Sequence, residues 1–124
     1  MKILHSFILF SIEVGGGTSD LMYKICKAQA KSGLKPTILS GSYAFDKELA
    51  NTLNGVDFHV EKTWMHKLGF SLMPGLIFWC RNNLQQYDVV HMHVYRTFQN
   101  VVLYYYCRKY QIPYVMDAHG SVPY

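Results

Sequence analysis

The chain has 124 residues, half of them hydrophobic and only 16% charged, which predicts one packed domain and excludes a disordered chain. The formal net charge is +4, but Lys and Arg form no cluster, so we expect an anionic ligand or membrane surface and no nucleic-acid partner. Three cysteines at spacings unlike a zinc or redox motif, and a start without a signal-peptide pattern, predict a cytoplasmic protein. The sequence contains no run of 18 apolar residues, so we expect no membrane span.

The first half of the chain alternates between strand-like and helix-like patterns. Residues 2–10 are almost continuously apolar, as in a strand buried on both faces of a parallel sheet. A loop over 11–18 follows, and apolar residues three and four apart then predict a helix over 19–32 that ends at Gly33. The next expected elements are a strand over 37–39, a short helix over 46–53 and a strand over 56–60.

The second half begins with an irregular and unusually apolar stretch over 62–74. Because proline is favoured at a helix start, we expect a helix over 74–86. A strand over 89–94, a helix over 98–110 and a strand over 114–117 complete the chain. This β-α-β-α-β-α-β-α-β order predicts an α/β fold, a Rossmann-like parallel sheet with helices on both faces.

Three consecutive glycines, Gly15, Gly16 and Gly17, lie between the first strand and the first helix. Glycines there let the backbone approach a ligand closely, and a helix N-terminus favours a phosphate. The stretch matches neither the GxGxxG fingerprint nor a P-loop, so it does not name the anion. An anion-binding loop is favoured, and a plain tight turn remains the alternative.

Histidines accompany the last two expected strands. His91 and His93 are two residues apart and share one face of their strand, with His93 nearer the carboxyl edge where ligands bind in such sheets. We expect His91 in the core, whereas functional and structural roles stay open for His93. His119 directly follows the last strand, next to Ser121, where it is placed to donate a hydrogen bond or exchange a proton. A simple turn histidine is its alternative.

A metal site has a weak basis in the sequence. A metal needs a third ligand, and although Asp117 and His119 could add ligands to the pair His91 and His93, two histidines are a weak basis, so we expect no metal. The other histidines, His5, His59 and His66, have no comparable context, and we expect them to be structural or exposed.

Aromatic and aliphatic residues crowd the region over 64–81, together with basic residues such as His66, Lys67 and Arg81. Apolar surface with basic flanks is typical of segments that bind anionic lipid. A simpler interpretation is a loop and a helix that cover the sheet. The covering role is favoured, and contact with a membrane surface or a lipid acceptor stays open.

Five segments carry a family resemblance, and they occur in a characteristic order. They are MKILH at 1–5, EVGGG at 13–17, AQAKSG at 28–33 leading into the strand at 37–39, DVVHMH at 88–93, and IPYV at 112–115 followed by His119 and Gly120. Together they span nearly the whole chain, which resembles the N-terminal domain of a glycosyltransferase family 4 (group 1) enzyme with the GT-B fold.

The resemblance implies a retaining enzyme that takes a sugar from a nucleotide-sugar donor, without a metal or other cofactor. In that family the N-terminal domain mainly binds the acceptor, and its glycine loop, here Gly16 and Gly17, approaches the donor diphosphate. The family's catalytic histidine beside the transferred sugar corresponds to His119. We assign Glu13, His93 and Ser121 to the acceptor or substrate.

The family's second domain, which holds the nucleotide and carries a pair of glutamates, has no counterpart in these residues. We therefore expect a single Rossmann-like acceptor-side domain over 1–124, inactive alone, whose C-terminal GT-B partner is supplied in cis or in trans. A glycan or lipid-linked acceptor, polysaccharide biosynthesis, a peripheral membrane location and homodimerisation through an exposed sheet edge are further expectations. The alternatives are a non-catalytic Rossmann-like module that binds a nucleotide or a partner, and one subunit of a split glycosyltransferase.

Overall fold

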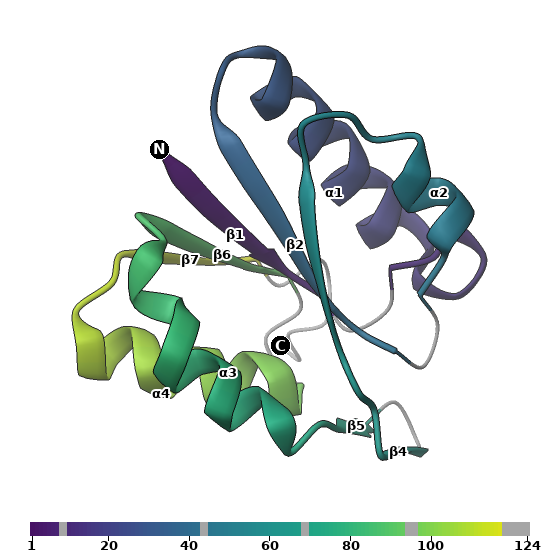
Figure 1. Ribbon diagram of the computed structural model, residues 1–124. Coiled ribbons are helices and arrows are strands. Elements are labelled where there is room, and N and C mark those ends of the chain that lie inside the picture. The colour runs from purple at the N-terminus through teal and green to yellow at the C-terminus, as the bar shows by residue number, and fades with distance from the viewer. Residues whose placement is uncertain (8–9, 43–44, 68–69, 94–96, 118–124) are drawn as a thin grey trace.

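A five-stranded, fully parallel sheet in the order β3-β2-β1-β6-β7 forms the centre of the protein, described here from a computed structural model (Figure 1). The structure describes residues 1–7, 10–42, 45–67, 70–93 and 97–117, without the side chains of 12–18, 66–67, 70–72 and 117. The strands of this sheet are β1 (Lys2–Ser6), β2 (Lys35–Gly41), β3 (Asp57–Glu61), β6 (Val89–His93) and β7 (Tyr114–Asp117).

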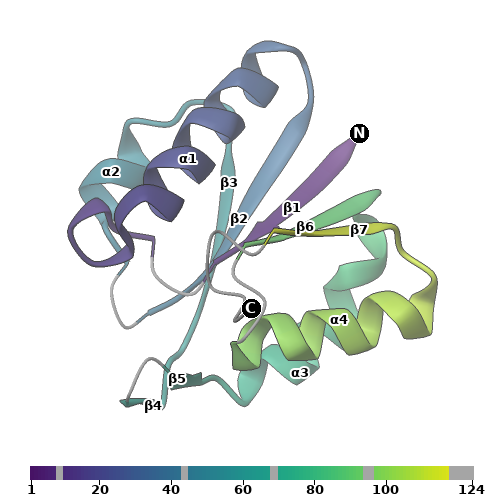
Figure 2. The same ribbon diagram turned by 180° about the vertical axis from the view of Figure 1, so that it is seen from behind.

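Helices cover both faces of this sheet (Figures 1 and 2). Helices α1 (Ile12–Lys31) and α2 (Lys47–Asn51) lie on one face. The other face carries α3 (Gly75–Asn83), the short 3-10 helix η1 (Leu84–Gln86) and α4 (Phe98–Tyr110). The predicted Rossmann-like α/β fold with helices on both faces is therefore confirmed.

The order in which the chain adds strands to the sheet reverses at β1. From β1 the chain adds β2 and β3 on one side, and it then returns to add β6 and β7 on the other side. In open parallel sheets the crevice at this switch point, outside the carboxyl ends of the strands, is the usual ligand site. Ser6 and His93 are the last residues of β1 and β6, so they mark that edge.

Alternating residues of the sheet supply two separate cores. The core under α3 and α4 contains Leu4, Leu39, Met73, Leu76, Cys80, Leu84, Tyr87, Val90, Met92, Leu103, Tyr106, Cys107 and Ile112. The core under α1 and α2 contains Phe7, Phe10, Met22, Cys26, Ile38, Ala50, Leu53 and Val56. Neighbours in sequence such as Ile38 and Leu39 enter opposite cores, because successive strand residues point to opposite faces.

Helix α1 begins at Ile12, so the predicted loop over 11–18 is wrong and the three glycines lie inside a helix. The expectation relied on the ability of glycines to form a tight turn, and glycine also has a low helix propensity, about 1 kcal/mol per residue less favourable than alanine. Tertiary anchoring outweighs that local preference here: Ser19, fully buried in α1, accepts a hydrogen bond from the backbone N–H of Ser11 at 3.2 Å. The predicted strand over 2–10 also ends early, at Ser6, although Phe7 and Phe10 remain buried.

The stretch predicted as irregular contains a small antiparallel hairpin, β4 (Met65–Lys67) and β5 (Phe70–Leu72). Strands of three residues leave no periodic signal in the sequence, which explains the omission. Helix α3 starts one residue after Pro74, at Gly75, where a Cβ atom would clash with Oε1 of Glu61. Boundaries elsewhere differ by a few residues from the expected ranges, 37–39 for β2, 46–53 for α2 and 56–60 for β3.

Helix α4 coincides with its predicted range and has strong signals at both ends. The side chain of Thr97 accepts a hydrogen bond from the backbone N–H of Asn100 at 3.0 Å, which caps the first turn. At the other end Gln111 adopts a left-handed conformation, with φ of 56°, that terminates the helix. The cap places Gln99 and Asn100 beside the carboxyl ends of the central strands.

We predict that Leu103→Ala lowers the free energy of unfolding by about 2–5 kcal/mol, because Leu103 is fully buried in the core under α4. The matched control is Val101→Ala on the same helix, where the side chain is 60% exposed and the change stays within about 0.5 kcal/mol. Urea denaturation followed by circular dichroism measures both values. Equal losses in the two variants would contradict the assignment of α4's inner face.

Candidate functional site

Buried polar residues gather at the switch point on the α4 side of the sheet. Ser6 Oγ donates a hydrogen bond to Asn100 Oδ1 at 2.6 Å, and Asn100 Nδ2 donates to the backbone carbonyl of His93 at 2.8 Å. Gln99 Nε2 donates to Ser6 Oγ and, at 3.0 Å, to the carbonyl of Leu39. These bonds join the ends of β1, β2 and β6 to the first turn of α4.

The polar cluster also presents a hydrogen-bond acceptor. Within the described part of the chain, Oε1 of the fully buried Gln99 has no hydrogen-bond partner. A buried acceptor without a partner costs about 1–3 kcal/mol. Because this oxygen is also inaccessible, it would meet a ligand or a water molecule only after a local rearrangement.

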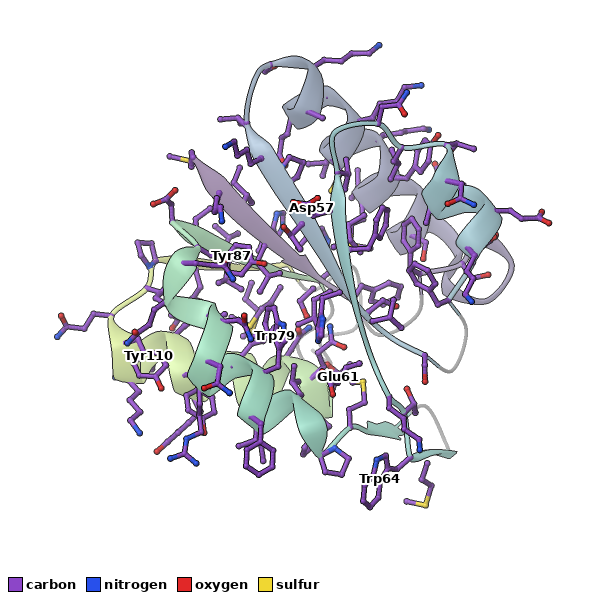
Figure 3. All side chains as sticks on the ribbon, viewed as in Figure 1. Asp57, Glu61, Trp64, Trp79, Tyr87 and Tyr110 are labelled. Carbon is purple, nitrogen blue, oxygen red and sulfur yellow. The ribbon has the colours of Figure 1, made fainter. Side chains whose placement is uncertain are left out.

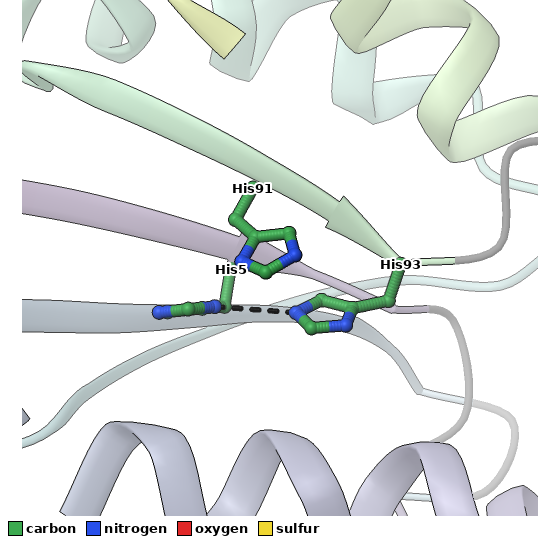
Figure 4. A group of neighbouring side chains, drawn as sticks. All are labelled: His5, His91 and His93. Atoms are coloured by element: carbon green, nitrogen blue, oxygen red, sulfur yellow. Dashed lines mark hydrogen bonds between the residues drawn. The ribbon is translucent and has the colours of Figure 1, made fainter. Parts of the chain in front are cut away.

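A cluster of three histidines occupies the opposite face of the same two strands (Figure 4). His5 on β1 pairs in register with His91 on β6, and His93 follows on the same face. His5 Nδ1 lies 3.2 Å from His93 Nε2, and the rings of His91 and His93 stack with centroids 4.0 Å apart. His5 and His93 are fully buried, and His91 is half-buried.

Burial keeps the central imidazole of this cluster neutral. Burial lowers the pKa of His5 to about 4; the hydrogen bond from His5 to Gln29 opposes this shift, and the neighbouring His91 adds to it. Gln29 on α1 places its Oε1 2.8 Å from His5 Nε2. At neutral pH His5 is therefore an uncharged imidazole with fixed hydrogen-bond roles.

Sequence reasoning missed the contribution of His5, which it treated as a residue without context. The signal that could have found it is register: in adjacent parallel strands, His5 and His91 are direct neighbours. Register follows from the sheet order, which the sequence pattern does not specify. His91, expected in the core, is in fact half-buried at the margin of the cluster.

The other predicted site residues are placed only in part. Glu13, Gly16 and Gly17 lie in the first half of α1, after the carboxyl end of β1, and the side chain of Glu13 is not described. His119 and Ser121 lie outside the described residues. The roles assigned to these five residues, and the acceptor role of His93, stay predictions.

The cysteines are not suited to nucleophilic chemistry. Cys26, Cys80 and Cys107 are all free and buried. Burial raises the pKa of Cys26 and of Cys80 to about 12 and that of Cys107 to about 11. Because the thiolate is the reactive form, these thiols act as small core residues.

The region over 64–81 has both a buried and an exposed part. Trp79 lies between α3 and the sheet, stacked on His59 with ring centroids 4.7 Å apart, whereas Trp64 lies at the periphery beside β4 (Figure 3). Trp64 is 68% exposed and Phe78 on α3 is 66% exposed. The covering role therefore holds for the buried part, and contact of the exposed part with a membrane surface or a lipid acceptor stays a prediction. None of the described helices has the length and hydropathy needed to cross a bilayer.

Comparison with known protein families identifies the chain. The sequence model of Glycosyltransferase Family 4 matches residues 15–124. Because this match covers most of the chain, the protein belongs to glycosyltransferase family 4 and contains its N-terminal type of domain, as the resemblance predicted. No curated protein and no solved structure matches the chain.

We predict that Asn100→Asp destabilises the protein by about 2–4 kcal/mol, since it replaces the donor to the His93 carbonyl with a buried carboxylate. The control is Asn51→Asp at the exposed end of α2, which stays within about 0.5 kcal/mol. Chemical denaturation at pH 7 gives both values. A neutral effect at Asn100 would show that the polar cluster does not couple α4 to β6.

Proposed function

We propose that this chain is the acceptor-binding half of a retaining glycosyltransferase that transfers a sugar from a nucleotide-sugar donor to a glycan or lipid-linked acceptor. The match to the family over residues 15–124 carries the proposal. The fold supports it, because buried polar groups converge on the switch point of a parallel sheet, where ligands bind in such folds. The proposal requires a nucleotide-binding GT-B domain, in cis or in trans.

The start of α1 supplies the proposed contact with the donor diphosphate. In any α-helix the first four N–H groups have no acceptor within the helix, and they carry partial positive charge. In a helix that begins at Ile12, these groups precede Gly16 and Gly17, so the glycines would act chiefly by leaving room for the anion. As the bond to the sugar breaks, negative charge grows on the diphosphate, and N–H donors held in place stabilise it.

His119 would orient the transferred sugar, and Glu13, His93 and Ser121 would contact the acceptor or substrate. His93 is fully buried, and its carbonyl accepts a hydrogen bond from Asn100. Its proposed contact would therefore be made at the carboxyl end of β6, which this bond holds in place. No metal or other cofactor is required by this proposal.

The test measures sugar transfer by this chain combined with a C-terminal nucleotide-binding domain of the family, using a panel of UDP- and GDP-sugars. We expect His119→Ala to lower the transfer rate by about 100-fold or more, as for loss of one preorganised group at a reacting centre. The control is His59→Ala, because His59 lies on the edge strand β3 and stacks on Trp79. Calorimetric titration of the chain alone should detect little donor binding.

Two results would favour the rivals of this proposal. Tight nucleotide binding by the chain alone, indifferent to His119, would favour an independent Rossmann-like binding module. Activity that appears only with a separately expressed second chain would identify a split glycosyltransferase, in which this chain is one subunit.

The exposed residues of the α3 and α4 layer support a proposed membrane-facing role. Ile77 and Phe78 on α3 are exposed, next to the basic Arg81. On α4 a pocket of about 620 Å³ is lined by Val101, Tyr104, Tyr105, Arg108 and Lys109. Apolar groups beside cations suit an anionic bilayer surface, which is where a lipid-linked acceptor would be found.

We predict that the chain binds vesicles containing anionic phosphatidylglycerol and that the double variant Trp64→Ser with Phe78→Ser weakens this binding by about 10-fold or more, because both exposed rings are lost. The control is Leu21→Ser, which removes an exposed apolar side chain from α1 on the opposite face of the sheet and should bind as the parent does. Sedimentation with vesicles measures both. Equal binding by all variants would contradict the membrane role.

A further inference from the structure

We propose that His5, His91 and His93 form a binding site for a divalent transition-metal ion, with zinc as the best match. The three imidazoles come from two adjacent, paired strands, and one ligand atom of each lies within 4.8 Å of the others. The sequence-based expectation of no metal rested on His91 and His93 without His5. The metal site shares His93 with the proposed acceptor contacts, but no step of the transfer reaction is assigned to the metal.

The spacing of two of the nitrogens already matches coordination. In a tetrahedral zinc site with Zn–N bonds of about 2.0–2.1 Å, two ligand nitrogens lie about 3.3 Å apart. His5 Nδ1 and His93 Nε2 are 3.2 Å apart, which is also hydrogen-bond distance. An ion would therefore replace one hydrogen bond without moving the strands, and His91 would complete the set by a side-chain rotation.

Gln29 fixes the orientation of His5 as a metal site requires. With Gln29 Oε1 accepting from His5 Nε2, the proton of His5 sits on Nε2 and the lone pair of Nδ1 points toward His93. Histidine ligands of metals generally donate their second N–H to an oxygen acceptor, which sets the tautomer and strengthens the ligand. This bond links α1 to β1 behind the cluster, so the ring of His5 is held in place from the far side.

The chemistry of the donors selects the ion. Three neutral imidazoles suit zinc, cobalt, nickel or copper, whereas magnesium and calcium prefer oxygen ligands. Three histidines with an open fourth position, taken by water, are an established arrangement for zinc. His91 is half-buried, and its register partner Val115 on β7 is 53% exposed, so this is the side of the cluster nearest to solvent.

The first experiment titrates the chelator-treated full chain with zinc against a chromophoric chelator, and with cobalt by visible absorption. We expect one equivalent of each ion to bind, with the intense d–d bands of tetrahedral cobalt. His91→Gln should weaken binding by about 100-fold or more, because one of three ligands is lost. His59→Gln, which removes a histidine beside Trp79, should bind as the parent does.

A second pair of variants tests the positioning role of Gln29. Gln29→Leu removes the acceptor for His5 Nε2–H and should weaken zinc binding by about 10-fold. Gln29→Glu restores an oxygen acceptor and should bind at least as tightly as the parent chain. Circular dichroism of each variant without metal confirms that the fold is retained, which separates lost ligation from unfolding.

Zinc binding should also raise the thermal stability of the chain. Zinc at about 100 times its Kd should raise the Tm by roughly 5–10 °C in the parent chain and leave His91→Gln almost unchanged. The proposal is overturned if folded, chelator-treated protein takes up no stoichiometric zinc or cobalt, or if His91→Gln and His5→Gln bind as the parent does. Either result would make the cluster a hydrogen-bonded part of the core.

Discussion

Much of the structure depends on the pairing of β1 between β2 and β6. Its alternating side chains face different surroundings: Leu4 enters the core under α4, His5 meets Gln29 of α1, and Ser6 bonds to Asn100 of α4. Parallel strands cannot slip by one residue without exchanging their two faces. A single register therefore fixes both cores, the polar cluster and the histidine cluster together.

The sequence is most informative where the signals are local. The limits of α4 and β7 agree with expectation, because Thr97 caps the helix and Pro113 precedes the strand. The start of α1 differs from expectation because the low propensity of glycine is a weak, local term that burial of Ser19 and the rest of the helix outweighs. The spacing of residues in the sequence does not reveal tertiary contacts of this kind, so it could not predict where α1 starts.

The candidate site also has a part that the sequence predicts and a part that it does not. The end of β6 at His93 was predicted to within one residue, whereas β1 ends at Ser6, four residues before the end of the predicted strand over 2–10. Which side chains meet across this edge could not be predicted, because it depends on the order of strands and on which helix covers each face. His5 shows this: its neighbour His91 is distant in sequence and adjacent only through the register of β1 with β6.

His93 belongs to both faces of the sheet at once. Its imidazole contacts His5 on the α1 side, while its carbonyl accepts the hydrogen bond from Asn100 on the α4 side. A substitution at position 93 removes the imidazole and keeps the carbonyl, so it separates the histidine contact from the bond to Asn100. The Asn100 side-chain amide is in turn a natural NMR reporter on the histidines, since its resonance responds to any shift of the strand end on which their geometry depends.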